Sequence, residues 1–147
     1  ELIMTTNQSV LNNPIAQVRV LCGVLYVPHI VFKLLALDGA AAFFAKAGFQ
    51  PPLLFVVLAL LAETACAVAL TFNLLTKWVG LLSAGVMVVA AYAVVATKGP
   101  GWLWNLGGIE YLALWAGLSV IVAADAWQSE LATHGRRFLL MPVRAAS

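Results

Sequence analysis

Four long apolar segments dominate the chain, and short polar or glycine- and proline-rich connections separate them. Each segment is about twenty residues long and nearly free of charge, which is the length that crosses the hydrocarbon core of a bilayer. The segments cover residues 15–37, 52–72, 76–97 and 107–127. The pattern therefore predicts an all-α membrane protein, built as a bundle of four transmembrane helices.

The residues between the segments predict where the helices begin and turn. Asn13 before Pro14 is typical of a helix start, with a side-chain cap and a proline at the first helical position. Pro51 and Pro52 open the second segment in a similar way. Residues 73–75 leave room only for a tight turn, so the second and third helices should form an antiparallel hairpin. The third connection, residues 98–105, holds two tryptophans, as membrane interfaces do.

The first connection is longer and more apolar than the others. Residues 39–49 combine small residues with three phenylalanines, which predicts a short amphipathic helix lying at the membrane interface. We expect Phe43, Phe44 and Phe49 on the lipid side of this helix.

Composition supports a membrane protein and argues against several other classes. Of the 147 residues, 63% are hydrophobic and only 10% are charged, whereas soluble domains average about 45–50% and about 25%. The net charge of +2 comes without a basic patch, which argues against nucleic acid as a partner. The first apolar segment carries Arg19, His29 and Lys33, so it is expected to be a retained span and not a cleaved signal peptide.

Charge placement predicts the domain organisation and the topology. We expect a tail over residues 1–14, a membrane domain over 15–127 and a basic cytoplasmic tail over 128–147, with residues 1–3 before Met4 as a cloning remnant. Most basic residues outside the spans lie on the side of the two termini. The positive-inside rule therefore places both termini in the cytoplasm.

Five ionisable residues lie within the apolar segments, where a charge at the bilayer centre costs about 2.5–3.5 kcal/mol. They are Arg19, His29, Lys33, Glu63 and Glu110. At about 100° per residue, the first three fall on one side of the first helix, and Tyr26 and Cys22 share that side. A polar stripe of this kind should face the interior of the bundle.

Depth along the helices suggests how these charges pair. We expect Arg19 to pair with Glu63 in the cytoplasmic half, and Lys33 with His29 to face Glu110 in the outer half. Two structural interpretations stay open: ion pairs that only fix helix register, and a Lys33 side chain that extends to the interface.

A candidate ligand site lies around His29. Imidazole suits proton transfer or hydrogen bonding to a ligand, and Pro28 should kink the helix by leaving the carbonyl near Val24 without a partner. A kink without function is the alternative. Cys22 and Cys66 are expected to act as small hydrophobic residues, and whether they pair stays open. No metal-ligand spacing occurs in the sequence.

Several motifs together resemble the DoxX family of small four-helix membrane proteins. The first span reads R-x-x-x-G and then H-x-x-x-K, here Arg19, Gly23, His29 and Lys33. The blocks AAAFFAKAGFQPP, LTFNLLTKWVGLL and GGIEYLALW follow in the family's order, with Glu63 between the first two. The resemblance covers residues 15–126.

The resemblance implies a redox-associated protein of the bacterial inner membrane. Namesake relatives are small subunits of a membrane thiosulfate:quinone oxidoreductase. By analogy, a quinone or other lipophilic ligand would bind near Tyr26, His29, Lys33 and Glu110, with no covalently bound cofactor. Because the chain has no haem, flavin or iron–sulfur motif, an enzymatic role would be that of a subunit of a quinone-linked oxidoreductase, with a partner redox subunit.

Two alternatives stay open at this point. The chain can be a non-enzymatic accessory subunit that helps a larger membrane complex assemble. It can also form a small-solute or proton pathway, for which homo-oligomerisation is expected because four helices enclose only a narrow channel.

Overall fold

The computed structural model describes residue 10 and residues 12–134, and its helices confirm the predicted all-α class. The elements are α2 (Pro14–Val24), α3 (Tyr26–Leu35), α4 (Leu37–Lys46), α5 (Pro52–Phe72), α6 (Thr76–Lys98), the 3-10 helix η1 (Trp104–Leu106) and α7 (Glu110–His134). Within the described residues, four helical stretches are long and apolar enough to cross a membrane: Pro14–Leu35, Pro52–Phe72, Thr76–Lys98 and Glu110–Ala132. The protein is therefore an integral membrane protein.

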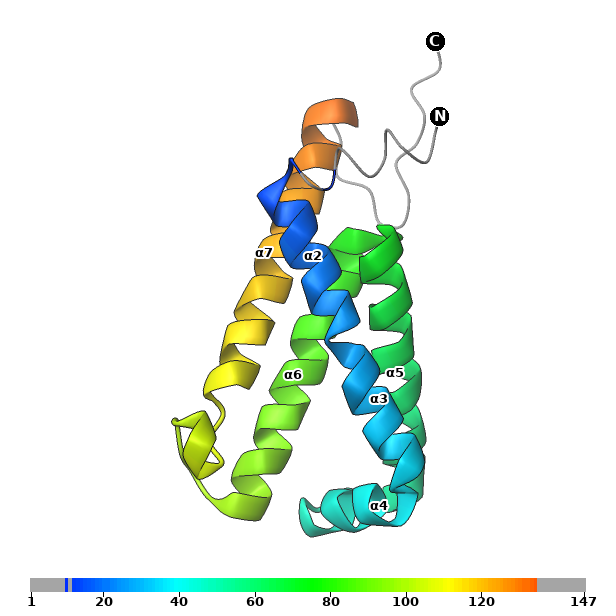
Figure 1. The fold of residues 1–147 in the computed structure, drawn as a ribbon, viewed down its shortest axis with the longest axis vertical. Helices are drawn as coiled ribbons and strands as arrows, with labels where there is room; N and C mark the ends of the chain where they lie inside the picture. The colour runs from blue at the N-terminus through cyan, green and yellow to red at the C-terminus, as the bar shows by residue number, and fades with distance from the viewer. Residues whose placement is uncertain (1–9, 11, 135–147) are drawn as a thin grey trace.

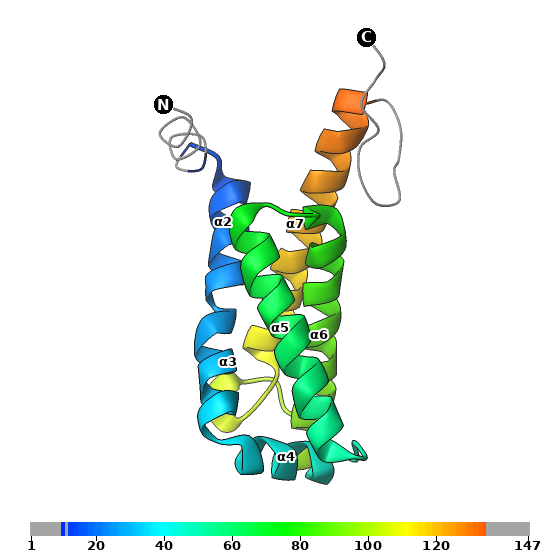
Figure 2. The same cartoon turned by 90° about the vertical axis from the view of Figure 1, so that its right-hand side faces the viewer.

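The four spans run side by side along the long axis of the molecule, and α4 lies across one end of them (Figures 1 and 2). We call this end the α4 end. At the opposite end, here called the terminal end, α2 begins, α5 turns into α6, and α7 finishes. Toward the α4 end, α3 and α7 diverge from each other (Figure 1).

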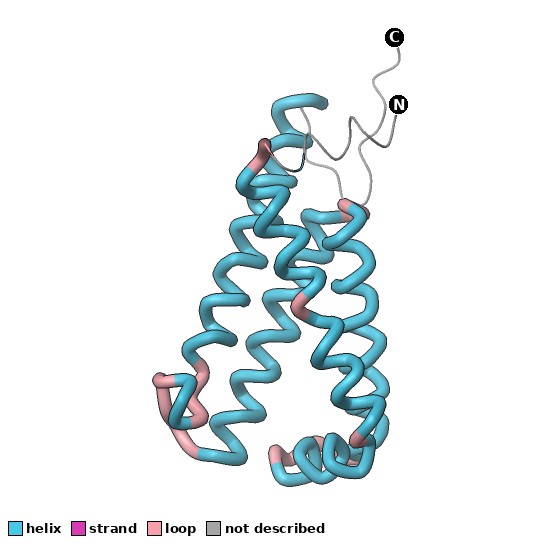
Figure 3. The backbone as a smooth tube through the Cα atoms, viewed as in Figure 1, coloured by secondary structure: helices cyan, strands magenta, loops and turns pink. Residues whose placement is uncertain are grey.

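The first span is interrupted at Leu25, where α2 ends and α3 begins, as Figure 3 shows. The interruption lies one turn before Pro28, whose missing N–H leaves the carbonyl of Val24 without its helical partner. The helix is thus interrupted close to the place where Pro28 was predicted to disturb it.

The hairpin predicted between the second and third spans is also present. Asn73 and Leu75 both adopt left-handed backbone conformations, with φ of 59° and 48°. The Thr76 hydroxyl donates to Asn73 Oδ1 at 2.7 Å, and Leu74 N donates to Ala69 O at 2.8 Å. These bonds hold the reversal within three residues.

The first connection contains the predicted short helix, α4, but its aromatic face points elsewhere than expected. Phe44 is only 9% exposed and contacts Phe43 and Phe49 at ring distances of 6.1 and 5.4 Å. Together with Val56 of α5, it forms a small core of its own. The lipid-facing orientation predicted for Phe44 is therefore wrong, because α4 turns this face onto α5.

The fourth span differs from its predicted bounds of 107–127. The helix α7 begins at Glu110 and continues to His134, because the residues after Trp127 contain no glycine or proline before Gly135. The predicted basic tail from 135 onward, and the N-terminal residues 1–9 and 11, lie outside the described residues.

Close packing between α6 and α7 depends on one small residue. A Cβ atom built on Gly80 would lie 2.8 Å from the Cβ of Ala123 and 2.9 Å from the carbonyl oxygen of Ser119. Small residues that let helix backbones approach are a common device of membrane bundles. This contact brings the polar side chains of α6 and α7 within reach of each other.

Candidate functional site

The predicted polar stripe on the first span mostly faces the bundle. Arg19 and Tyr26 are buried and Lys33 is partly buried, whereas His29 is exposed. Within the stripe, Arg19 and Lys33 contact α5, and Tyr26 contacts α6 and α7.

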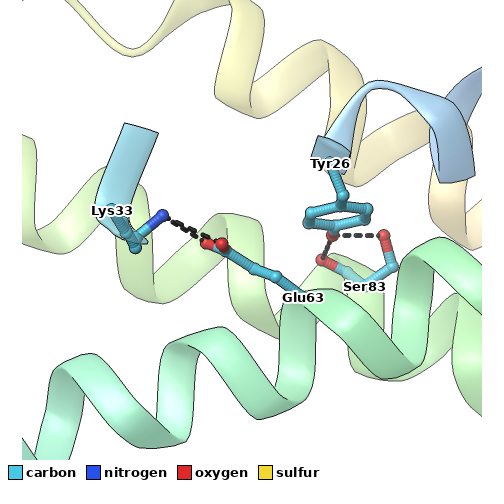
Figure 4. Close-up of polar contacts among 4 residues, drawn as sticks. All are labelled: Tyr26, Lys33, Glu63 and Ser83. Atoms are coloured by element: carbon cyan, nitrogen blue, oxygen red, sulfur yellow. Dashed lines mark hydrogen bonds and ion pairs between the residues drawn. The ribbon is translucent and has the colours of Figure 1, made fainter. Parts of the chain in front are cut away.

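Lys33 and Glu63 form an ion pair between α3 and α5. The Lys33 Nζ atom donates to both carboxylate oxygens of Glu63, at 2.7 and 2.9 Å (Figure 4). The two side chains are 16% and 8% exposed. Two charge-assisted bonds of this length compensate part of the cost of burying both charges.

Arg19 does not pair with Glu63, and the predicted Arg19–Glu63 pair is therefore wrong. Its Nη1 atom donates instead to the carbonyl oxygens of Leu70 and Thr71, the latter at 3.2 Å. These carbonyls belong to the last turn of α5, where the helix itself supplies no donors. Glu63 lies seven residues earlier on α5, about 10 Å along the axis, which places it beside Lys33.

Tyr26 is the centre of a buried hydrogen-bonded chain that joins three helices. Its hydroxyl lies 2.7 Å from the hydroxyl of Ser83 on α6 (Figure 4), and Ser83 lies 2.8 Å from the hydroxyl of Ser119 on α7. All three residues are fully buried. Tyr26 was predicted to share the polar stripe, but neither serine was predicted, because its only signal was a hydroxyl within an apolar span.

Trp115 on α7 packs against the first span beside His29. Its ring centroid lies 4.6 Å from that of Tyr26 and 5.6 Å from that of His29. The side chain is 5% exposed, and its buried Nε1 has no hydrogen-bond partner among the described residues. Sequence reasoning missed this residue because a tryptophan in a span is usually a packing residue.

Glu110 does not join the other charges. It opens α7 and accepts a hydrogen bond from the backbone nitrogen of Trp104, in the preceding connection, at 3.3 Å. The predicted pairing of Lys33 with Glu110 is wrong, because Lys33 binds Glu63.

The comparison with protein families bears directly on this arrangement. The model of the DoxX family matches residues 15–96, more than half of the chain. The chain belongs to the DoxX family. The searches of curated proteins and of solved structures each returned no match.

The DoxX match covers the first three spans and stops before α7. It includes Arg19, Tyr26, Lys33 and Glu63, whose side-chain contacts tie the first span to α5 and α6. Trp115 and Ser119 lie outside the match, as does the block around Glu110 that also resembled the family. The site beside His29 therefore combines a DoxX polar stripe with residues of the fourth helix.

The two cysteines lie beside the buried hydroxyl chain, Cys22 next to Ser119 and Cys66 next to Tyr26. Cys22 and Cys66 are both buried, free thiols. No three His, Cys, Asp or Glu side chains come together in a metal-holding arrangement within the described residues.

Proposed function

We propose that this DoxX protein is redox-associated and binds the head group of a quinone-like lipophilic ligand beside His29 and Trp115. The observation that carries the proposal is the buried Trp115 indole nitrogen, which has no partner among the described residues and whose ring packs against the exposed His29. Leaving a buried donor unsatisfied costs about 1–3 kcal/mol. An incoming carbonyl oxygen removes that cost.

The head group of a quinone offers two carbonyl oxygens, and this site offers a set of donors. The Trp115 N–H donates a hydrogen bond to one carbonyl oxygen, and the imidazole of His29 can donate to the same oxygen or to the other oxygen. Neighbouring side chains cover the indole nitrogen, so binding includes a local side-chain rearrangement.

The Lys33–Glu63 pair adds a fixed charge arrangement one helical turn from His29. An ammonium has three donors, and the two bonds to Glu63 leave one N–H for a ligand oxygen. Negative charge that develops on a reduced head group is stabilised by this cation, since electrostatic interactions are strong where water is excluded.

Access to the site is from the side, through the lipid. α3 and α7 diverge toward the α4 end (Figure 1), and His29 is exposed in this half of the bundle. The surface of α3 near it is apolar, with Phe32 and Leu35 68% and 83% exposed. A ligand dissolved in the bilayer reaches His29 without crossing water.

Electrons for such a role come from a partner redox subunit, because the sequence carries no haem, flavin or iron–sulfur motif. We place the protein in a bacterial inner membrane with its terminal end in the cytoplasm. The described lysines do not favour this orientation, because Lys77 lies at the terminal end and Lys46 and Lys98 lie at the α4 end. The orientation therefore depends on the basic residues of the sequence from 135 onward.

The test is organic extraction of the protein purified in mild detergent, followed by chromatography with mass detection of quinones and lipids. Trp115→Phe keeps the ring and removes only the N–H, and His29→Leu removes the second donor. We expect stoichiometric quinone in the wild type and at least a tenfold loss in both variants.

Trp78→Phe is the matched control, because Trp78 also has a buried Nε1 without a described partner but packs on Trp127 at the terminal end. Its quinone content should equal that of the wild type. A wild-type protein free of quinone, or a Trp115→Phe variant that retains it in full, contradicts the proposed site.

The second candidate is a non-enzymatic accessory subunit. The observation in its favour is that Lys33 pairs with Glu63, and Tyr26 with Ser83 and Ser119, so these side chains bond to one another across four helices of the bundle. Under this interpretation the polar stripe only fixes the bundle, and a pull-down in mild detergent should recover stable partners even from the His29→Leu and Trp115→Phe variants.

A further inference from the structure

A second polar region lies at the terminal end, away from His29 and Trp115. A cavity of about 490 Å³ is bounded there by the start of α2, the turn between α5 and α6, and the last turns of α7. Its polar lining comes mainly from Asn13, Arg19, Asn73, Lys77, Asp125 and Glu130. Its volume falls within the range of small-molecule sites, about 300–1,000 Å³.

Among the described residues, four charged side chains line the cavity, and two of them neutralise each other. Lys77 is 3% exposed and forms an ion pair with Glu130 across α6 and α7. The two charges that remain are Arg19 on α2 and Asp125 on α7, and no ion pair joins them among the described residues.

Arg19 is 7% exposed, so its guanidinium is held in place within the bundle. Both of its described hydrogen bonds, to the carbonyls of Leu70 and Thr71, come from Nη1. A guanidinium has five N–H groups in a planar fork, so Nε and Nη2 carry three more. This planar edge matches the oxygens of a phosphate or a carboxylate.

Asp125 supplies the opposite charge from the facing helix. Its carboxylate lines the same cavity and is exposed, so its oxygens are accessible to a bound group. A simple anion satisfies Arg19 but is repelled by Asp125. A group with an oxyanion at one end and an ammonium at the other satisfies both.

We infer that this cavity binds a phosphoethanolamine group, with the phosphate on Arg19 and the primary ammonium on Asp125. The group can be the head of an ethanolamine phospholipid or a free molecule, and the chemistry of recognition is the same for both. The cavity lies toward the terminal end of the spans, and the ends of transmembrane helices are where lipid head groups are found. This inference is independent of the quinone proposal, because no residue is shared between the two sites.

The first experiment measures binding of O-phosphoethanolamine to the full chain in mild detergent by calorimetry, beside phosphocholine and inorganic phosphate. We expect phosphoethanolamine to bind about tenfold more tightly than phosphocholine, because a quaternary ammonium has no N–H to donate to Asp125. Asp125→Asn should weaken phosphoethanolamine binding by about tenfold while leaving inorganic phosphate unchanged or tighter.

Asp38→Asn is the matched control, because Asp38 is an exposed aspartate on α4 at the opposite end. Its affinity should equal that of the wild type. Arg19→Gln is a weaker test, because Arg19 also bonds the end of α5 and the variant can unfold. Asp125 is exposed, so its variant keeps the fold, which a circular dichroism spectrum checks.

The second experiment separates the two sources of the group. The protein is reconstituted in nanodiscs of phosphatidylethanolamine or of phosphatidylcholine, and free O-phosphoethanolamine is titrated into each. If apparent binding is weaker in the phosphatidylethanolamine discs, the lipid competes for the cavity and is its occupant. If binding is equal in both discs, the occupant is a free molecule. Both results support the inference. Absence of phosphoethanolamine binding in detergent, or an Asp125→Asn variant with unchanged affinity, overturns it.

Discussion

The Nζ atom of Lys33 lies 2.7 and 2.9 Å from the two carboxylate oxygens of Glu63, so one ion pair joins α3 to α5 within the membrane-spanning part of the bundle. Both side chains are largely buried. Removing either partner leaves the other charge without compensation, and this sets a clear expectation for mutagenesis.

We expect Lys33→Met to destabilise the protein by about 3 kcal/mol or more, since breaking a buried pair strands a charge. The double variant Lys33→Met with Glu63→Leu should recover most of that loss, because it removes both charges. Thermal unfolding in detergent measures the effect, and Lys46→Met on the exposed side of α4 is the control. A double variant as unstable as the single one contradicts the pairing.

The hydroxyl chain from Tyr26 to Ser119 should behave as a coupled unit. Tyr26→Phe is expected to lower the free energy of unfolding by about 1 kcal/mol, the typical net value of one hydrogen bond. A double-mutant cycle with Ser83→Ala should show a coupling energy of about 0.5 kcal/mol or more. Tyr92→Phe is the control, since Tyr92 is 58% exposed; purely additive effects would argue against the chain.

Gly80 should tolerate no side chain, because a Cβ atom there meets Ala123 and the backbone of Ser119. Gly80→Val is expected to destabilise the protein by about 1–3 kcal/mol through overpacking between α6 and α7. A Cβ atom added to Gly85 would have no neighbouring atom within 4 Å, so Gly85→Ala should be neutral or stabilising by up to about 1 kcal/mol. Equal unfolding midpoints for the Gly80→Val and Gly85→Ala variants would contradict the close contact of α6 with α7 at Gly80.

The packing of α4 onto α5 can be tested through its aromatic residues. Phe44→Ala should destabilise the protein by about 3–5 kcal/mol, the usual range for a buried phenylalanine, because Phe44 lies in a core with Ala40 and Val56. Phe32→Ala serves as the control, since that ring is 68% exposed. If both variants unfold at the wild-type temperature, the aromatic face of α4 lies on lipid, as its sequence pattern predicts.

Much of the fold follows from the sequence because length and apolarity alone define a membrane span. The helix start at Pro14, the tight turn at residues 73–75 and the break before Pro28 each follow from local backbone chemistry, which needs no knowledge of neighbouring helices. The orientation of Phe44 did not follow, because an apolar helix face looks the same whether lipid or protein covers it.

The pairing of charges was less predictable, since it depends on how helices lie beside one another. Counting residues from each helix end gives depth but not rotation or lateral position, and Glu63 therefore appeared within reach of Arg19. The role of Trp115 could not be predicted for a related reason, because whether its N–H has a hydrogen-bond partner depends on how the helices pack.

The contact between Arg19 and the last carbonyls of α5 has a consequence for how the protein is made. During synthesis the first span leaves the ribosome with Arg19 in its apolar length, and an arginine without a partner in a span is costly. Its acceptors, Leu70 and Thr71, are translated about fifty residues later. We therefore expect the first span to stay at the insertion machinery until the second arrives, and the two to enter the lipid together as one helical hairpin.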